Sequence, residues 1–416
     1  MSTKLTQSPS VTQGEINQVI FSLAWPSVVS QVLFQIPSIY DAFWLGKIGP
    51  EAQAAAGLAM AIRITMISLL MALSAATGAV VARFLGAGDQ EKADAATFNG
   101  VVMMVLTSGA LGIFGLLFTS PLMKLAGASP DVLPLAVRYS RILFAGLIAM
   151  ELVPSMGGVF TAAGVPKLRL SMMSCTVGTI LIAEPFLMKW WGLEGTVAAL
   201  VLAHTTGMFW GFSKLIQGHY AVRINLHKMI LDKEMMWRIL KIASPAVVQR
   251  GFPNLAMVIL IRLISGFGAQ TLAAWMIVRT LSTFALLVAQ GISGISGAMV
   301  GQNLGAKKPE RAKMAVRVIS RAVLFISSAI LIILAVFAPG ILNLFSNDPM
   351  TLNTAVSILR VLVVGYIAQA LSWVYDSALV GAGDTVSPML VYSFMWALQL
   401  PLAFLLSKGL NYGTMG

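Results

Sequence analysis

Two carboxylic acids stand inside long apolar runs of this chain, and both can take up a proton or a cation. Asp41 lies in LFQIPSIYDAFWL (33–45), and Glu184 lies in TILIAEPFLM (179–188). An ionised aspartate at the centre of a membrane-spanning helix costs about 2.5–3.5 kcal/mol, so such a group is paired, protonated or in contact with water. The two acids therefore predict a proton or cation coupling site. Tyr40, directly before Asp41, is an accessory candidate.

Other ionisable residues in apolar runs are candidates for supporting roles. Glu151 and Arg63 are placed to form an ion pair, and a purely structural pair is the favoured interpretation. His204 carries an imidazole, which suits a proton relay, although a lone histidine on an apolar helix is more often packed and hydrogen-bonded. Arg250 and Arg279 are candidates for a substrate cavity, where they would favour an anionic group.

The first apolar run also contains two prolines, Pro26 and Pro37. Each removes a backbone hydrogen bond from a helix and permits a bend. A bend close to a titratable Asp41 is a plausible coupling device, so both prolines are hinge candidates.

These residues belong to a chain with the composition of a membrane protein. Of its 416 residues, 57% are hydrophobic and 11% are charged, and the mean hydropathy is +0.84. A soluble domain carries roughly 25% charged residues, and about 20 apolar residues cross a bilayer. Runs of that kind occur at 17–44, 52–80, 97–120, 133–160, 168–191, 195–216, 240–267, 271–300, 315–338, 354–381 and 387–407. We predict an all-α polytopic protein with eleven spans in the lipid bilayer.

The chain also repeats itself. FSLAWPSVVSQ (21–31) matches LKIASPAVVQR (240–250), and ARFLGAGDQEKADAA (82–96) matches GQNLGAKKPERAKMA (301–315), both at an offset of 219 residues. Each half holds an even number of spans, so the halves are parallel repeats about an axis along the membrane normal. The same offset pairs Asp41 with Leu260 and Glu184 with Ala403. The two acids therefore have no counterparts in the second half. This favours a functional site over a requirement of the fold.

The repeat predicts the organisation of the chain. We expect a cytoplasmic N-terminal tail at 1–16, an N-lobe of six helices at 17–216, a cytoplasmic linker at 217–239 and a C-lobe at 240–416. GLNYGTMG (409–416) corresponds to the start of the sixth helix, so a twelfth helix is expected to be missing from this chain. The first run is too long for a cleavable signal peptide and is expected to remain as an anchor.

The basic residues fall mainly in alternate loops. Seventeen of them, including Arg169, are assigned to one side and four (Lys47, Lys124, Lys189 and Lys408) to the other. The positive-inside rule then places the N-terminus in the cytoplasm. We expect a multi-pass protein of the cytoplasmic (inner) membrane. The net charge of +12 therefore indicates membrane orientation and not a nucleic-acid partner. The single cysteine, Cys175, excludes an internal disulfide and a cysteine-rich metal site.

Taken in order, these motifs resemble the multidrug and toxic compound extrusion (MATE) family. The residues that carry the resemblance are LGAG (85–88), LGAK (304–307), VGAGDT (380–385), TAAGVP (161–166) and IYDAFWLGKIGPEAQAAAGLA (39–59). The resemblance implies a secondary antiporter whose two six-helix lobes form a V around a central cavity. It implies export of small organic, cationic or amphipathic compounds against an inward flow of protons or sodium ions, with no cofactor and no enzymatic activity. A monomer is expected.

The resemblance also implies a site. In one prokaryotic branch, acids in the first and fifth helices form a proton or cation site, and Asp41 and Glu184 match these places. The branch has an asparagine and a threonine where this chain has Ile180 and Leu202, so we favour protons over sodium as the coupling ion. Another branch has an acid in the tenth helix where this chain has Gln369, which makes that residue a further cavity candidate.

Two rival functions need different features. A lipid-linked glycan flippase of related two-lobe fold would need a strongly cationic cavity, and the arginines of the second half keep this alternative open. An intramembrane aspartyl protease is disfavoured because Asp89 and Asp384 are predicted to lie in loops after helix ends. A sodium-coupled version of the exporter is the third alternative.

Overall fold

The computed structural model describes residues 11–218, 220, 222–224, 230–345 and 348–409, and these form helices and no strand. The expected start of a twelfth helix at 410–416 lies outside the described residues. The helices of the first half are α1 (Ile16–Ile48), α2 (Pro50–Gly86), α3 (Gln90–Leu117), α4 (Thr119–Leu125), α5 (Leu133–Ala145), α6 (Leu147–Ala162), α7 (Pro166–Trp191) and α8 (Leu193–Gln217). Those of the second half are α9 (Lys233–Ser265), α10 (Ala269–Ala285), α11 (Leu287–Gly305), α12 (Pro309–Val336), α13 (Ala338–Leu342), α14 (Pro349–Ala382), α15 (Val386–Phe404) and the π-helical turn η1 (Leu405–Gly409).

The eleven apolar runs correspond to eleven helical segments. Within the described residues, seven helices are long and apolar enough to cross a membrane. Two further spans are bent pairs, α5 with α6 at 50° and α10 with α11 at 51°. The remaining two runs lie in α8 and α9, which have 25 and 33 residues. The bends do not follow the repeat. The bent pair α10 and α11 corresponds to α2, which is continuous, and the bent pair α5 and α6 corresponds to α14, which is also continuous.

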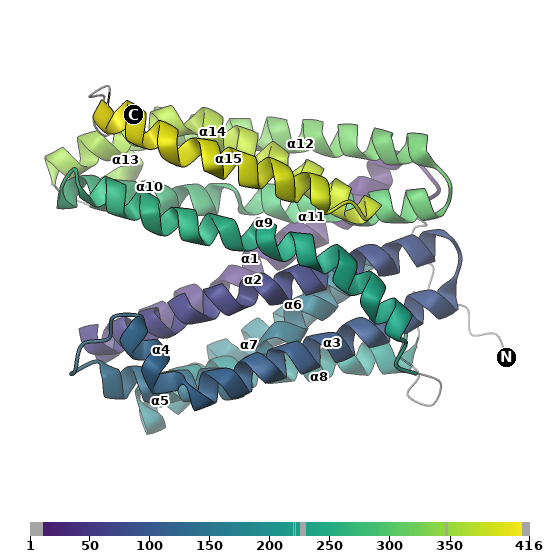
Figure 1. The fold of residues 1–416 in the computed structure, drawn as a ribbon, viewed down its shortest axis with the longest axis horizontal. Helices are drawn as coiled ribbons and strands as arrows, with labels where there is room; N and C mark the ends of the chain where they lie inside the picture. The colour runs from purple at the N-terminus through teal and green to yellow at the C-terminus, as the bar shows by residue number, and fades with distance from the viewer. Residues whose placement is uncertain (1–10, 219, 221, 225–229, 346–347, 410–416) are drawn as a thin grey trace.

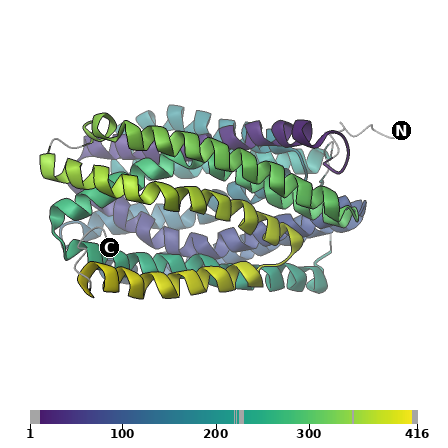
Figure 2. The ribbon, with the colours of Figure 1, turned by 90° about the horizontal axis from the view of Figure 1, so that it is seen from above.

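The helices form two bundles that meet at one end and diverge at the other, as Figure 1 shows. Helices α1–α8 make up the N-lobe and α9–α15 the C-lobe, and in a view at right angles the helices of both lobes run along a common direction (Figure 2). The predicted all-α, two-lobe architecture is confirmed. The lobes meet at the end of the bundle where α1 and α9 begin.

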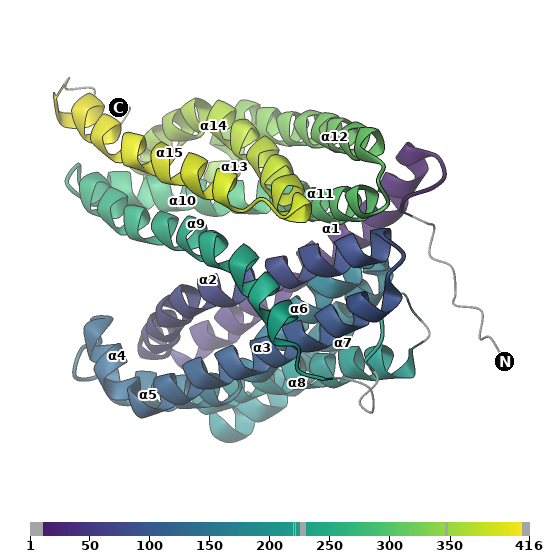
Figure 3. The same cartoon turned by 45° about the vertical axis from the view of Figure 1, so that its right-hand side comes forward.

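The first helix of each half crosses between the lobes. Buried residues at the start of α1, among them Ile20 and Leu23, belong to the hydrophobic core of the C-lobe. Met235, Ile239 and Ala243 at the start of α9 belong to the core of the N-lobe. Figure 3 shows α9 running obliquely from one bundle to the other. Packing therefore does not divide the chain at residue 240, the C-lobe boundary expected from the sequence.

Glycines bring the lobes into backbone contact where they meet. A Cβ atom on Gly86 of α2 would overlap the Gln302 carbonyl of α11, and one on Gly305 would overlap the Arg83 carbonyl. The 219-residue offset relates these two contacts to each other. Further along the seam, a Cβ on Gly291 would lie 2.6 Å from the Val28 Cα. Such close approach requires residues without side chains, which gives the LGAG and LGAK motifs a structural role.

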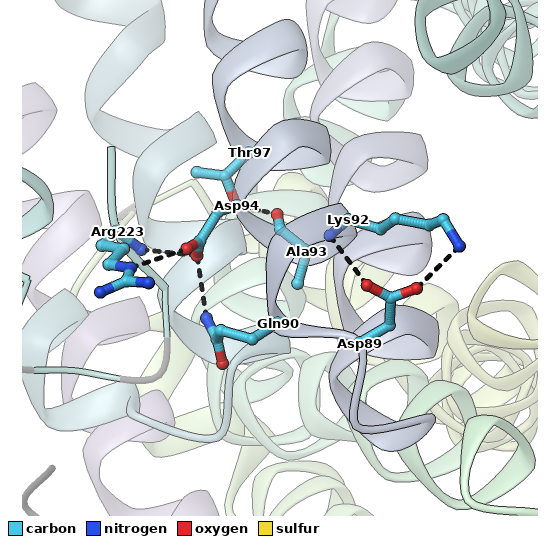
Figure 4. Close-up of polar contacts among 7 residues, drawn as sticks. All are labelled: Asp89, Gln90, Lys92, Ala93, Asp94, Thr97 and Arg223. Atoms are coloured by element: carbon cyan, nitrogen blue, oxygen red, sulfur yellow. Dashed lines mark hydrogen bonds and ion pairs between the residues drawn. The ribbon is translucent and has the colours of Figure 1, made fainter. Parts of the chain in front are cut away.

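The segment that links the lobes is fixed to α3. Asp94, which is buried, accepts hydrogen bonds from the Arg223 backbone N and Nε, both at 3.0 Å, and from Gln90 Nε2 at 2.9 Å (Figure 4). The Asp232 backbone N donates to Asn99 Oδ1 at 3.0 Å. Nearby, the Asp89 side chain caps α3, and its hydrogen bonds with Lys92 lower the pKa of Asp89.

Candidate functional site

Asp41 of α1 and Glu184 of α7 lie side by side in the interior of the N-lobe. Both are buried, with exposed fractions of 4% and 0%. The Tyr139 hydroxyl of α5 donates to Asp41 Oδ2 over 3.4 Å, and Thr196 of α8 also lies beside Asp41. Asp41 Oδ1 and both Glu184 oxygens have no partner within hydrogen-bond geometry.

This arrangement has a direct chemical consequence. Two adjacent buried carboxylates cannot both be ionised cheaply, so the pair favours holding a proton. The unpaired oxygens leave room for that proton between or beside the acids. The pair is therefore suited to reversible protonation, which changes its net charge inside the lobe.

A second group of ionisable side chains lies beside the acid pair. Arg63 Nη2 of α2 and Glu151 Oε1 of α6 form an ion pair at 2.9 Å, with side-chain exposures of 16% and 3%. His204 of α8 is buried, and its Nδ1 lies 2.8 Å from the Leu200 carbonyl oxygen. Because a carbonyl oxygen can only accept, Nδ1 carries a proton and donates this hydrogen bond, as expected for a packed histidine.

Asp41, Arg63 and His204 all line one small cavity in the N-lobe. Its volume is about 40 Å³, which admits water but not a drug-sized molecule. Pro37 and Ser38 of α1 form part of its wall. The structure thus brings Asp41 together with the predicted accessory residues Arg63, Glu151 and His204.

A larger cleft lies between α1 of the N-lobe and α10 of the C-lobe, with a volume of about 500 Å³. Gln35, Ser38 and Ile39 line it from α1, and Met276, Arg279 and Phe284 line it from α10. Ser38 therefore borders both the cleft and the cavity of Asp41. One turn of α1 separates the acid pair from a space large enough for a small organic molecule.

The other candidates from the sequence lie elsewhere. The Tyr40 hydroxyl donates to the Leu181 carbonyl oxygen of α7 at 3.2 Å, so it joins α1 to α7. Arg250 is half-buried on α9, and Gln369 is exposed on α14. Neither of them lines the described cavity or cleft. Pro26 and Pro37 both lie within α1, which runs through them as one helix.

Two neighbours of Asp41 were not foreseen. Tyr139 corresponds to Ile358 in the second half. The lack of a polar counterpart, which drew attention to Asp41, therefore also applied to Tyr139. Thr196 of α8 provides a hydroxyl beside Asp41. The family resemblance implied a threonine ligand at position 202 of the same helix, where this chain has a leucine. Leu202 is 43% exposed. Ile180, by contrast, is fully buried in the lobe core.

Arg169 also differs from its expected place. It was counted among the loop charges, but its Nη2 donates to Gln31 Oε1 at 3.3 Å. Gln31 Nε2 in turn donates to Gln290 Oε1 of α11 at 3.0 Å. This chain of polar contacts joins α7, α1 and the C-lobe, one turn from the cleft residue Gln35. Arg169 is therefore part of the seam between the lobes.

Comparisons with known proteins agree with this architecture. The FAD transporter of Shewanella oneidensis is 24% identical over 401 residues, which cover 94% of this chain and 88% of that protein. The multidrug resistance protein NorM of Burkholderia vietnamiensis is 26% identical over 420 residues, covering 98% and 90%. The outward-facing structure of a multidrug resistance MATE family transporter of the MOP superfamily superposes with a TM-score of 0.91 at 20% identity, covering 99% and 92%.

The MatE family model matches the chain twice, at residues 26–186 and 245–405. The second match begins 219 residues after the first, which is the offset of the sequence repeat. Together the matches cover most of both lobes and include both acids of the N-lobe pair. The chain therefore belongs to the MatE family and is a MATE transporter, a secondary transporter of small compounds.

Proposed function

We propose that this protein is a proton-coupled antiporter that exports small organic compounds, with Asp41 and Glu184 as its proton site. One observation carries the proposal: two buried, adjacent carboxyl groups with unpaired oxygens lie one turn of α1 away from the cleft. Family membership supports transport, and the acid pair supplies the coupling chemistry.

The shared wall of α1 explains how protonation acts on the cleft. Proton loading removes charge from the N-lobe interior, which lowers the cost of packing α1 more tightly against α7. Pro37 and Ser38 lie within one turn of Asp41, so such a movement displaces the cleft wall directly. Pro26 lies three residues after Leu23, in the part of α1 that packs against the core of the C-lobe, and is the hinge of this movement.

We favour protons over sodium as the coupling ion. A sodium ion needs several oxygen ligands, and Ile180 supplies none from its side chain. The hydroxyls of Tyr139 and Thr196 offer two neutral oxygens beside Asp41, so a sodium-coupled version is the rival that an experiment must separate. The lipid-linked glycan flippase alternative calls for a strongly cationic cavity, and the cleft lining contributes one arginine.

The orientation follows from the charges at the closed end of the bundle. Arg83, Lys92, Lys167, Arg223 and Lys308 all lie where the lobes meet or in the loops next to that seam. By the positive-inside rule, this end faces the cytoplasm and the cleft faces outward. We propose a multi-pass protein of the cytoplasmic (inner) membrane that works as a monomer and does not alter its substrate chemically.

The relatives leave the substrate open, because their names include both multidrug resistance and FAD transport. The coupling proposal can be tested without knowing the physiological substrate. Purified protein in liposomes would be given a proton gradient at constant sodium, and then a sodium gradient at constant pH, with a panel of fluorescent dyes as cargo. We expect transport with the proton gradient alone.

Variants assign the effect to the acid pair. Asp41→Asn should abolish proton-driven transport while the protein remains folded and inserted, and Glu184→Gln should impair it less severely. Asp376→Asn is the matched control, because Asp376 is a carboxylate of the C-lobe that accepts from Gln249 Nε2 at 2.7 Å. Normal proton-driven transport by Asp41→Asn, or transport by a sodium gradient alone, would falsify the mechanism.

A further inference from the structure

The cleft between α1 and α10 carries a charge that bears on the class of its substrate. Of the residues that line it, Arg279 is the charged one, and its side chain is exposed. Within the described part of the chain, Arg279 makes no ion pair with a carboxylate, and its guanidinium lies 5.6 Å from the centre of the Trp275 ring. Its positive charge is therefore left for a ligand.

The acids of the N-lobe do not neutralise this cleft. Asp41 is 4% exposed and lines the smaller cavity, and it is not among the residues that line the cleft. Glu184, beside Asp41, is fully buried, and Glu151 is already paired with Arg63 at 2.9 Å. A cationic substrate in the cleft would therefore meet a positive charge without a compensating negative one.

The repeat indicates that the fold does not require a charged residue at the position of Arg279. Its counterpart at the 219-residue offset is Met60, which lines the N-lobe cavity. An apolar side chain thus satisfies the fold at the equivalent place in the first half. The rest of the cleft is suited to an amphipathic molecule, because Ile39, Met276 and Phe284 offer apolar contacts and Gln35 and Thr280 offer hydrogen bonds.

We propose that this cleft binds organic anions, with Arg279 pairing with a carboxylate or phosphate group while Phe284, Met276 and Ile39 contact an aromatic or aliphatic body. This inference rests on the proposed function, because it names the substrate class of the same exporter. The proposed organic anions take the place of the cationic compounds that the family resemblance implied. An arginine matches the planar, two-oxygen geometry of carboxylate and phosphate better than a lysine does.

Equilibrium binding to the purified protein in detergent tests the proposal without a gradient. Three aromatic probes of comparable size separate the chemistries: fluorescein carries a carboxylate, flavin mononucleotide carries a phosphate, and ethidium is a cation. We expect at least one of the two anions to bind about tenfold tighter than ethidium. The stronger of the two anions identifies which group Arg279 prefers.

Variants connect that preference to one side chain. Arg279→Gln should weaken binding of the preferred anion about tenfold to a hundredfold, which is the usual effect of removing a charge-assisted contact, and should leave ethidium unchanged or bound more tightly. Arg279→Lys should retain part of the affinity. Arg262→Gln is the matched control, because Arg262 is exposed on α9 outside the cleft lining.

Tighter binding of ethidium than of both anions, or equal anion binding by wild type and Arg279→Gln, would overturn the anion proposal. The outcome is distinguishable from a failure of the proton mechanism. Equilibrium binding in detergent needs no proton gradient, so anion binding without proton-driven transport would contradict the proton mechanism alone. Proton-driven transport of ethidium, without binding of either anion, would contradict the anion proposal alone.

Discussion

Ile20 and Ile239 occupy equivalent positions in the two halves of the chain, and each is buried in the hydrophobic core of the other half. Pro26 and Pro245 lie six residues after Ile20 and Ile239, within α1 and α9. The lobes therefore cannot separate as two independent bodies. Any movement between them must bend α1 and α9 beyond Ile20 and Ile239, where proline has already removed a backbone hydrogen bond.

This exchange predicts that the two halves stay together without a covalent link. A protease site introduced between residues 225 and 229, followed by complete cleavage, should yield two fragments that co-elute as one particle in mild detergent. The association relies on packing between helices, which is not weakened by cutting the linker. Separation of the fragments on size-exclusion chromatography, at protein concentrations where the uncut chain is stable, would contradict this view.

The glycine seam gives a second prediction. Gly86→Ala places a methyl group against the Gln302 backbone, and overpacking of this kind costs about 1–3 kcal/mol. The substitution should shift the lobes away from the closed seam. Gly57→Ala, in the same helix with nothing within 4 Å of the added Cβ, is the matched control.

Cross-linking measures that shift. In a Cys175→Ser background, Gln31→Cys and Gln290→Cys place two thiols across the seam, where the glutamines are hydrogen-bonded at 3.0 Å. A short bifunctional thiol reagent should join them efficiently in the parent and in Gly57→Ala, and about tenfold more slowly in Gly86→Ala. Equal rates in all three proteins would show that the glycine contact does not hold the seam.

The sequence predicted the lobes, the repeat and the acid pair because each depends on residue type and spacing along the chain. Hydrophobic runs and a constant offset are visible without coordinates, and so is an acid without a polar mate. The sequence did not reveal that the first turns of α1 and α9 pack in the opposite lobes, because apolar residues such as Ile20 and Ile239 fit the core of either lobe. Arg169 was assigned to a loop for a similar reason: proximity to a span end does not say whether a side chain turns into the protein.

Tyr139 provides a test of the acid pair that leaves both acids in place. Tyr139→Phe removes the hydroxyl that donates to Asp41 Oδ2, and a hydrogen bond to a charged group contributes about 1.5–3 kcal/mol when its geometry is good. At 3.4 Å we expect the lower part of that range, and a roughly tenfold loss in the rate of proton-driven transport. Tyr366→Phe, in the C-lobe, should transport at the wild-type rate. An unchanged rate for Tyr139→Phe would place Tyr139 outside the coupling machinery.

The ion pair between Arg63 and Glu151 should be structural. Glu151→Gln leaves Arg63 largely buried without a counter-charge, and breaking a buried pair in this way costs about 3–5 kcal/mol. The double variant Arg63→Met with Glu151→Leu should melt closer to the wild-type temperature than either single variant, because it leaves no unpaired charge. Proton-driven transport by the double variant separates the roles: retained transport fits a structural pair, and its loss despite recovered stability would assign the pair to the proton pathway.

The last prediction concerns the attachment of the linker to α3. Asp94 accepts three hydrogen bonds from the linker residue Arg223 and from Gln90. Asp94→Ala should free the linker and raise the rate of chymotrypsin cleavage between residues 217 and 232 about tenfold, because the rate follows the free energy of local opening. Arg223→Ala keeps the bond from its backbone N and loses a side chain that is 58% exposed, so its effect should be smaller. Asp89→Asn retains a capping side chain on the same helix and should leave the rate unchanged. If Asp94→Ala were cleaved no faster than Asp89→Asn, the linker would be held by its buried residues Val222 and Ile224 instead.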